Sequence, residues 1–256
     1  MRQRLVLLFI LMTLGTSFAQ RDGKSYYDTF EGKWINPNKW VATFPQAWGN
    51  PLEIVREVRG GQLRLALRNT GNSDSDSGIQ WAENELYFSN QSRIFSITTD
   101  LTPRNASTTT CPANPDGPAV HLTVGGSFFN SGTGDPQQDV VAVLVVGDAS
   151  PKTVGVNLWV ATDYGATSQS IGIDYYPLGQ RLTLYLKWDK ANHQFIASVT
   201  ANGVPTQVSL PYAFADTMPP ASPSKTLAVE LQTQNCTATK MYSYGEALFD
   251  NVSINQ

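Results

Sequence analysis

Hydrophobic and polar residues alternate along most of this chain. The clearest example is the segment 181–188, in which every second residue is apolar: Leu182, Leu184, Leu186 and Trp188. A period of two residues indicates a β-strand with one face in a core. The same pattern recurs through most of the chain after its N-terminal segment, and no helical period is convincing there. The sequence therefore predicts an almost entirely β protein.

The predicted strands are short and follow one another closely. They cover 54–58, 62–68, 95–101, 120–129, 139–147, 154–161, 170–173, 181–188, 195–199, 226–232 and 247–254. Turn signals such as Asn202-Gly203 separate them, and residues 103–118 are expected to form a loop. The segment 139–147 is apolar on both faces, which is typical of a central strand covered on both sides. Since there is no internal repeat or long linker, the pattern predicts a single-domain antiparallel β-sandwich or jelly roll.

The N-terminus has the features of a secretory signal peptide. Two arginines precede an apolar stretch, residues 5–14, which is about half the length needed to cross a bilayer. Ser17 and Ala19 then stand at the −3 and −1 positions of a signal-peptidase site. We therefore predict that residues 1–19 are cleaved, that the protein is secreted or periplasmic, and that residues 20–256 form one domain without membrane insertion after cleavage.

Charge and cysteine content narrow the possible partners. Removing the two arginines of the predicted signal peptide from the 18 basic residues leaves 16, against 21 acidic ones. This mildly acidic balance argues against nucleic acid as a partner. The chain has two cysteines, Cys111 and Cys236. In an oxidising compartment two distant cysteines most simply pair, so we predict a disulfide, with two free thiols as the alternative.

Three segments carry a resemblance to a known superfamily. They are Asp28–Gly32 followed by Trp40, Leu182–Asp189 with Phe195, and Phe249–Ile254. Together they resemble the concanavalin A-like lectin/glucanase superfamily in its bacterial secreted branch, and their order and spacing span nearly all of the mature chain. The resemblance implies a jelly roll of two large antiparallel sheets, one of them concave. Because that superfamily holds lectins, glucanases, alginate lyases and modules of unknown role, the fold alone does not settle function.

The catalytic motifs of the enzymes in that superfamily are missing. The chain has no Glu-x-Asp-x-Glu strand of the laminarinase type and no Arg-x-Glu-x-Arg strand of the alginate lyases, and His121 lacks the preceding glutamine of a Gln-x-His pair. The nearest substitute is the segment 81–87, where Glu83 and Glu85 would share one strand face with an aromatic residue at each end. The alternative interpretation is an edge strand that its glutamates keep soluble. We therefore expect no catalytic residue, with Glu83 and Glu85 as weak candidates.

The resemblance also implies a structural calcium ion. Asp250 matches the aspartate of the closing strand that binds it in laminarinase-like relatives, and backbone oxygens near Glu31 and at Gly60 or Gly61 would complete the site. Carboxylate and carbonyl oxygens are the ligands that calcium prefers. The alternative is that Asp250 caps a turn or forms hydrogen bonds within the sheet.

Several side chains are candidates for sugar binding, because flat rings stack on the C–H faces of sugars and polar groups fix the hydroxyls. The aromatic candidates are Tyr175, Tyr176, Trp48 and Tyr164, whereas Trp34, Trp40 and Trp188 are expected in the core. Glu230 faces away from the apolar side of its strand and would contact a ligand if that face is the concave one.

We expect a secreted, non-catalytic, lectin-like protein whose partner is a polysaccharide or another glycan. One alternative is a polysaccharide-degrading hydrolase or lyase with a non-standard carboxylate pair, and another is an extracellular structural or adhesion module. An enzyme needs two carboxylates converging in a cleft, at least one with a raised pKa. A binding protein needs exposed aromatic rings in a groove, and a structural module needs an apolar patch or an unpaired sheet edge.

Overall fold

The computed structural model describes residues 25–42, 46–47, 53–162 and 167–256. The predicted signal peptide, Trp48 and Tyr164 lie outside these residues. The strands are β1 (Trp40–Ala42), β2 (Gln46–Ala47), β3 (Glu53–Arg59), β4 (Gln62–Thr70), β5 (Ile79–Phe88), β6 (Ser96–Thr108), β7 (Ala119–Asn130), β8 (Asp139–Ser150), β9 (Thr153–Thr162), β10 (Thr167–Pro177), β11 (Leu182–Asp189), β12 (Gln194–Ala201), β13 (Val204–Pro211), β14 (Lys225–Gln234) and β15 (Tyr242–Ile254). Short 3-10 helices lie at η1 (Gln91–Arg93), η2 (Pro136–Gln138) and η4 (Lys190–Asn192).

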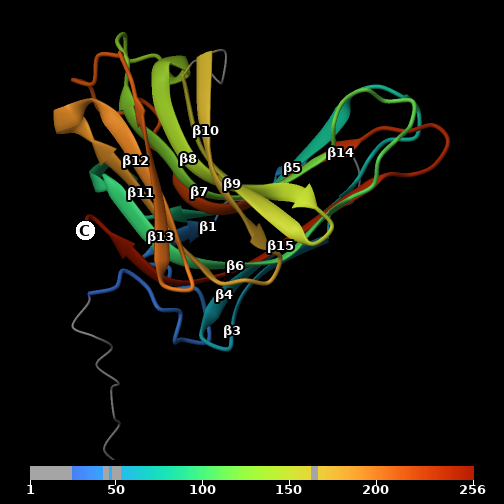
Figure 1. The fold of residues 1–256 in the computed structure, drawn as a ribbon, viewed down its shortest axis with the longest axis horizontal. Coiled ribbons are helices and arrows are strands. Elements are labelled where there is room, and N and C mark those ends of the chain that lie inside the picture. Colours follow the sequence, from blue (N-terminus) through green and yellow to red (C-terminus); the bar gives the residue numbers. More distant parts are fainter. Residues whose placement is uncertain (1–24, 43–45, 48–52, 163–166) are drawn as a thin grey trace, which may run out of the picture.

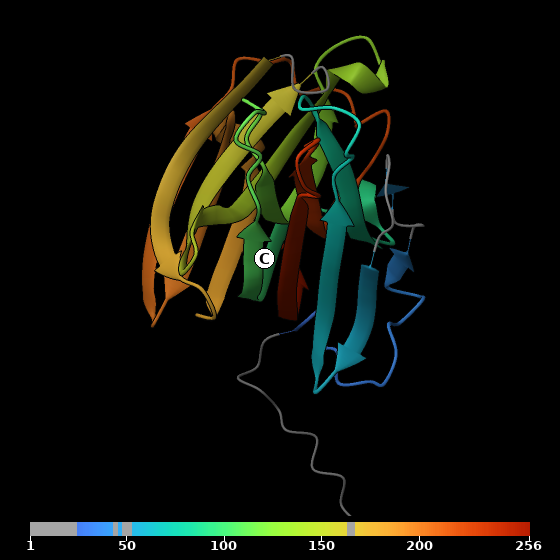
Figure 2. The ribbon, with the colours of Figure 1, turned by 90° about the vertical axis from the view of Figure 1, so that its right-hand side faces the viewer.

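The strands of the described residues form two antiparallel sheets (Figure 1 and Figure 2). The larger sheet has the order β1-β5-β14-β7-β8-β9-β10, with β2 also paired to β5. The smaller sheet has the order β13-β12-β11-β6-β15-β4-β3. Many neighbours within a sheet are distant in sequence, as β14 is from both β5 and β7. This architecture confirms the predicted all-β sandwich.

The core lies between the two sheets. Every second side chain of β11 from Leu182 to Leu186 is fully buried, and so are Leu122 and Val124 of β7 in the opposite sheet. Burial of these apolar faces is the main stabilising contribution, since it removes their surface from water. The period of two that predicted the strands therefore also selects which side chains face the partner sheet.

Two expectations about the framework are wrong. The predicted loop 103–118 begins too early, because β6 continues to Thr108. Pro103 lies opposite Ala247 where the register between β6 and β15 shifts, and a bulge is a place where a strand tolerates a proline without a backbone N–H. Trp34, expected in the core, is 85% exposed because it lies in the surface turn before β1. Trp40 is buried as expected.

A disulfide joins two loops at one end of the sandwich. Cys111 and Cys236 are bonded with their Cα atoms 5.6 Å apart, which confirms the predicted pair. Figure 1 shows the loop after β4, the loop after β6 and the loop after β14 gathered in a lobe at the right-hand end. The side chain of Asn235 strengthens this lobe by bonding to the backbone of Asn72 and Ser77. No helix in the described part of the chain is both long and apolar enough to span a membrane.

Candidate functional site: a groove on the larger sheet

The outer face of the larger sheet carries a groove with a volume of about 620 Å³. It extends over β5, β14, β7, β8, β9 and β10. The side chains that carry its chemistry are Trp81, Glu85, Tyr87, His121, Thr123, Asn157, Trp159 and Glu230. A groove of this size with apolar walls and a few convergent polar groups is typical of a ligand-binding site.

The floor of the groove explains the apolar character of β8. Val141, Val143 and Val145 point away from the core and line the groove. The sequence predicted a central strand covered on both sides, and the second cover is absent in the described residues. An apolar sheet face that no second layer covers provides a surface for the hydrophobic part of a ligand.

Two carboxylates, Glu85 and Glu230, line one side of the groove, and Glu83 lies beside them on the same face of the sheet. We call these three residues the carboxylate cluster. On β14, Glu230 lies directly opposite Glu83 of β5 on one side and His121 of β7 on the other. Opposite residues on neighbouring strands have their Cβ atoms about 5 Å apart, and like charges in such a pair repel each other. When its carboxyls are ionised, the cluster therefore holds like charges close together in the sheet, which is electrostatically unfavourable.

Burial raises the pKa values of all three carboxyls, and repulsion from neighbouring carboxylates adds to this effect for Glu230 and Glu83. Burial raises the pKa of Glu230 to about 7; Glu83 and Glu85 act in the same direction, while a hydrogen bond from Thr123 Oγ1, at 2.8 Å, opposes them. Burial, followed by the charge of Glu85, raises the pKa of Glu83. Burial also raises the pKa of Glu85, although a hydrogen bond from Tyr87 and the charge of Arg56 oppose this effect. Glu230 therefore still binds a proton at pH values where an ordinary glutamate is ionised.

The neighbouring groups offset only part of this negative charge, and the cation among them, Arg56, acts on Glu85 without lining the groove. Burial lowers the pKa of His121, although Asp148 opposes this effect, so the imidazole is neutral at pH 7. The Tyr87 hydroxyl donates a hydrogen bond to Oε2 of Glu85 at 2.6 Å, which orients that carboxylate. Among the described residues that line the groove, none is a lysine or an arginine. The groove is therefore acidic.

Aromatic rings border the acidic part of the groove. Trp81 and Tyr87 lie on the same face of β5 as the two glutamates between them, as the period of two predicts. Trp81 is 39% exposed. Trp159 of β9 lines the groove on its other side. The strand β5 is flanked by β1 and β2 on one side and β14 on the other, so the interpretation of its glutamates as edge-strand residues is wrong.

The structure separates the other predicted sugar-binding residues. Tyr175 is 72% exposed on the outer face of β10, whereas Tyr176 is only 7% exposed and packs in the core. Successive strand residues point to opposite faces, so the two tyrosines cannot form one platform, and the prediction for Tyr176 is wrong. Glu230 lines the groove, as the prediction required. Trp48 and Tyr164 lie outside the described residues.

Some groove residues were missed from the sequence. His121, Thr123 and Asn157 have ordinary positions in alternating strands, and only the strand order 5-14-7-8-9 brings them beside the carboxylate cluster. The usable signal was the alternation itself, which marks these side chains as outward-facing. It does not show which of the two outer faces they occupy.

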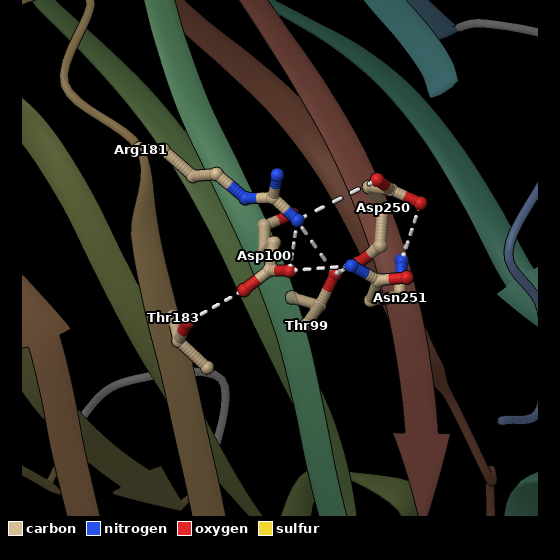
Figure 3. A network of polar contacts seen from close by, with 6 residues as sticks. All are labelled: Thr99, Asp100, Arg181, Thr183, Asp250 and Asn251. Carbon is tan, nitrogen blue, oxygen red and sulfur yellow. Dashed lines mark hydrogen bonds and ion pairs between the residues drawn. The ribbon is translucent and has the colours of Figure 1, made fainter. Parts of the chain in front are cut away.

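The predicted calcium ligands lie away from the groove: Asp250 and the turn at Gly60 and Gly61 belong to the smaller sheet, and Glu31 lies in the segment before β1. Figure 3 shows Asp250 beside Arg181, whose guanidinium also reaches Asp100 on the neighbouring strand. The Arg181–Asp250 ion pair measures 3.6 Å, and the carboxylate of Asp250 accepts a hydrogen bond from the N–H of Asn251 at 2.7 Å. The backbone turns sharply at Asn251, with a φ of 50°, which breaks the register with β6.

This geometry bears on the calcium prediction. The Glu31 carboxylate approaches Gly61, with Oε2 only 3.6 Å from the position of an added Cβ, so two of the predicted partners lie together. Asp250, however, already faces a guanidinium, and an ion bound there would have to share the carboxylate with Arg181. The described residues fit a calcium ion only in part, and calcium at Asp250 stays a prediction.

No protein-family model matches the sequence, and no curated protein matches it. Among solved structures, the chain is similar to a family 7 alginate lyase, A1-II′ Y284F in complex with product, with 14% identity, 76% of this chain and 80% of that chain covered, and a TM-score of 0.42. It is also similar to the lectin UEA-II complexed with galactose, with 8% identity, 86% and 96% covered, and a TM-score of 0.40.

A third similar structure is lectin II from Ulex europaeus, with 9% identity, 84% of this chain and 96% of that chain covered, and a TM-score of 0.38. The TM-scores of these three structures all lie below 0.5, so the likeness carries no argument about the superfamily of this chain. At such low identities and scores the likeness says nothing about function, which has to be argued from the groove.

Proposed function

We propose that this protein is an exported, glycan-binding protein that holds its ligand in the groove of the larger sheet. The observation that carries the proposal is the combination of Trp81, Tyr87 and Trp159 with carboxylate, amide and hydroxyl groups in one groove of about 620 Å³. A sugar presents an apolar C–H face and a rim of hydroxyls, so it needs rings and hydrogen-bonding groups side by side. The disulfide between Cys111 and Cys236 supports a secreted or periplasmic location.

The charge of the groove limits the class of glycan. The carboxylate cluster repels a uronate chain, because its burial leaves little water to screen the interaction. A neutral sugar is not repelled by the cluster, and its hydroxyl groups can donate hydrogen bonds to the ionised carboxylates. A neutral polysaccharide is therefore the expected partner.

The test is affinity electrophoresis and calorimetry of the purified protein with laminarin, cello-oligosaccharides and alginate. We expect binding to a neutral probe, weaker binding to alginate, and loss of the neutral binding in Trp159→Ala. Phe95→Ala is the matched control, because Phe95 is an exposed aromatic residue outside the groove. If no probe binds, or if Phe95→Ala and Trp159→Ala weaken binding equally, the proposal is wrong.

A second candidate function is hydrolysis of the bound glycan. The specific observation in its favour is the cross-strand pair of Glu230 and Glu83, in which the pKa of Glu230 is raised to about 7. A carboxyl that keeps its proton near neutral pH is suited to protonate a leaving glycosidic oxygen, and glycosidases pair such an acid with a second carboxylate. This arrangement meets the condition for an enzyme stated above, although the sequence motifs of the related enzymes are missing.

Release of reducing ends separates the two candidates. If the protein hydrolyses a neutral probe, Glu230→Gln should abolish release while the variant still binds the probe. If the wild-type protein binds a probe and releases no reducing ends, hydrolysis is excluded for that probe and the binding function stands.

A further inference from the structure

A second hollow adjoins the groove on the same face of the larger sheet. It has a volume of about 300 Å³ and lies over β9 and β10, between Gly155, Asn157, Gly172, Asp174 and Tyr175. Asn157 lines both the groove and this hollow, so the two meet at that side chain. The outer face therefore offers a path from the carboxylate cluster to the far edge of the sheet at β10.

Glycines form the floor of that path. Gly147 of β8 and Gly155 of β9 lie directly opposite each other. Gly172 of β10 lies opposite Asn157. A glycine inside a strand weakens it, because it adds chain entropy to the unfolded state and no side chain to the packing. Such glycines mark places where a ligand or another group approaches the backbone closely.

Two rings lean over these glycines from opposite sides. A methyl group added at Gly155 would lie 3.1 Å from Cε1 of Tyr175, and one added at Gly147 would lie 3.4 Å from Cδ2 of His121. A side chain at Gly155 would force the Tyr175 ring to shift, whereas one at Gly147 would only reach ordinary van der Waals contact with His121. Gly155 therefore lets the ring of Tyr175 lie close to the backbone of β9.

The strand register places these groups in a single row. Glu230 of β14 lies opposite His121 of β7, which lies opposite Gly147, and the row continues through Gly155 to Tyr175. Four steps between neighbouring strands span about 19 Å. That is the length of several sugar units, and the row runs across the strands. Tyr175 is 72% exposed at its end, so its ring is available to a ligand.

We propose that Tyr175 forms an outlying subsite that stacks one unit of an extended polysaccharide lying across the strands over the glycine floor. This inference rests on the proposed glycan-binding function and deepens it. The ligand is then a polysaccharide that the protein binds through several of its sugar units, and not a single terminal sugar bound beside the carboxylate cluster.

The experiment compares ligand length with the position of the substitution. Affinities are measured for the disaccharide, tetrasaccharide and hexasaccharide of the neutral probe that binds the wild-type protein. Tyr175→Ala should weaken the hexasaccharide about tenfold and leave the disaccharide unchanged, because only the longer chain reaches β10. Tyr175→Phe should retain affinity, and Trp159→Ala should weaken all three lengths.

Gly155→Ala provides a second variant, since its added methyl group would lie 3.1 Å from Cε1 of Tyr175 and the ring would have to shift to make room. It should reproduce the length-dependent loss, and its melting temperature shows whether the fold is intact. Tyr242→Ala removes an exposed aromatic residue of the smaller sheet and should have no effect. If the wild-type protein binds the oligosaccharides and Tyr175→Ala changes none of them, or all equally, the subsite is refuted while glycan binding stands. If the wild-type protein binds none, both proposals fall.

Discussion

Replacing Glu230 by glutamine should stabilise the folded protein at neutral pH. Burial raises the pKa of Glu230 to about 7, against an ordinary value of 4.5. The folded state then binds a proton that the unfolded chain has released between these two pH values, so wild-type stability falls as pH rises through this window. The gap between the two pKa values corresponds to about 3 kcal/mol.

Glutamine has the same shape as glutamate and still accepts the hydrogen bond from Thr123, but it does not ionise. The free energy of unfolding of Glu230→Gln should therefore exceed that of the wild-type protein by about 3 kcal/mol above pH 7 and equal it near pH 4.5. The measurement is urea unfolding of both proteins across this range of pH, followed by circular dichroism.

Glu53→Gln is the matched control for that comparison. The side chain of Glu53 is 75% exposed and pairs with Arg68 on the smaller sheet, so its replacement should change stability by less than about 1 kcal/mol at any pH. A difference between Glu230→Gln and the wild-type protein that does not vary with pH would refute the reasoning. It would mean that Glu230 ionises in the folded protein as it does in water.

Three further predictions concern other parts of the molecule. Burial lowers the pKa of Lys225 to about 7. As the pH rises from about 7 to about 10, the folded state loses this proton before the unfolded chain does, so the free energy of unfolding should increase. Lys225→Met should flatten that increase, as measured by urea unfolding. Replacing Cys111 and Cys236 by alanine should lower the free energy of unfolding by about 5 kcal/mol, because their disulfide closes a loop of 125 residues; an unchanged urea midpoint would contradict this. If Asp250 binds calcium, a chelator should lower the melting temperature of the wild-type protein but not of Asp250→Asn, and equal melting curves would exclude the site.

The sequence predicted the framework of the fold well, because local periodicity reports burial. The alternation in 181–188 identified β11 and its buried face, and Asn202-Gly203 identified the hairpin between β12 and β13, where both residues adopt the positive φ that the turn requires. The end of β6 was missed because Pro103 signals a break, whereas pairing with β15 across a bulge keeps the strand intact.

The site was predictable only in part. The period of two placed Glu83 and Glu85 on one face, but β5 was interpreted as an edge strand because nothing local shows that β14 pairs beside it. Glu230 and His121 enter the same site through strand pairings that join residues more than 100 positions apart. Their chemistry arises from that proximity, since burial and repulsion raise the carboxyl pKa values and neither effect exists in the isolated segments.

By itself, the sequence determined the β class, the faces of the strands and the cysteine pair. These follow from the alternation of apolar residues and from the presence of two cysteines, and both are local or countable properties of the chain. Only the tertiary structure decided which outer face carries the groove, that Tyr176 is buried while Tyr175 is exposed, and that three glutamates share one site. Those features depend on the order of strands in a sheet, which is set by long-range packing of the two apolar faces against each other.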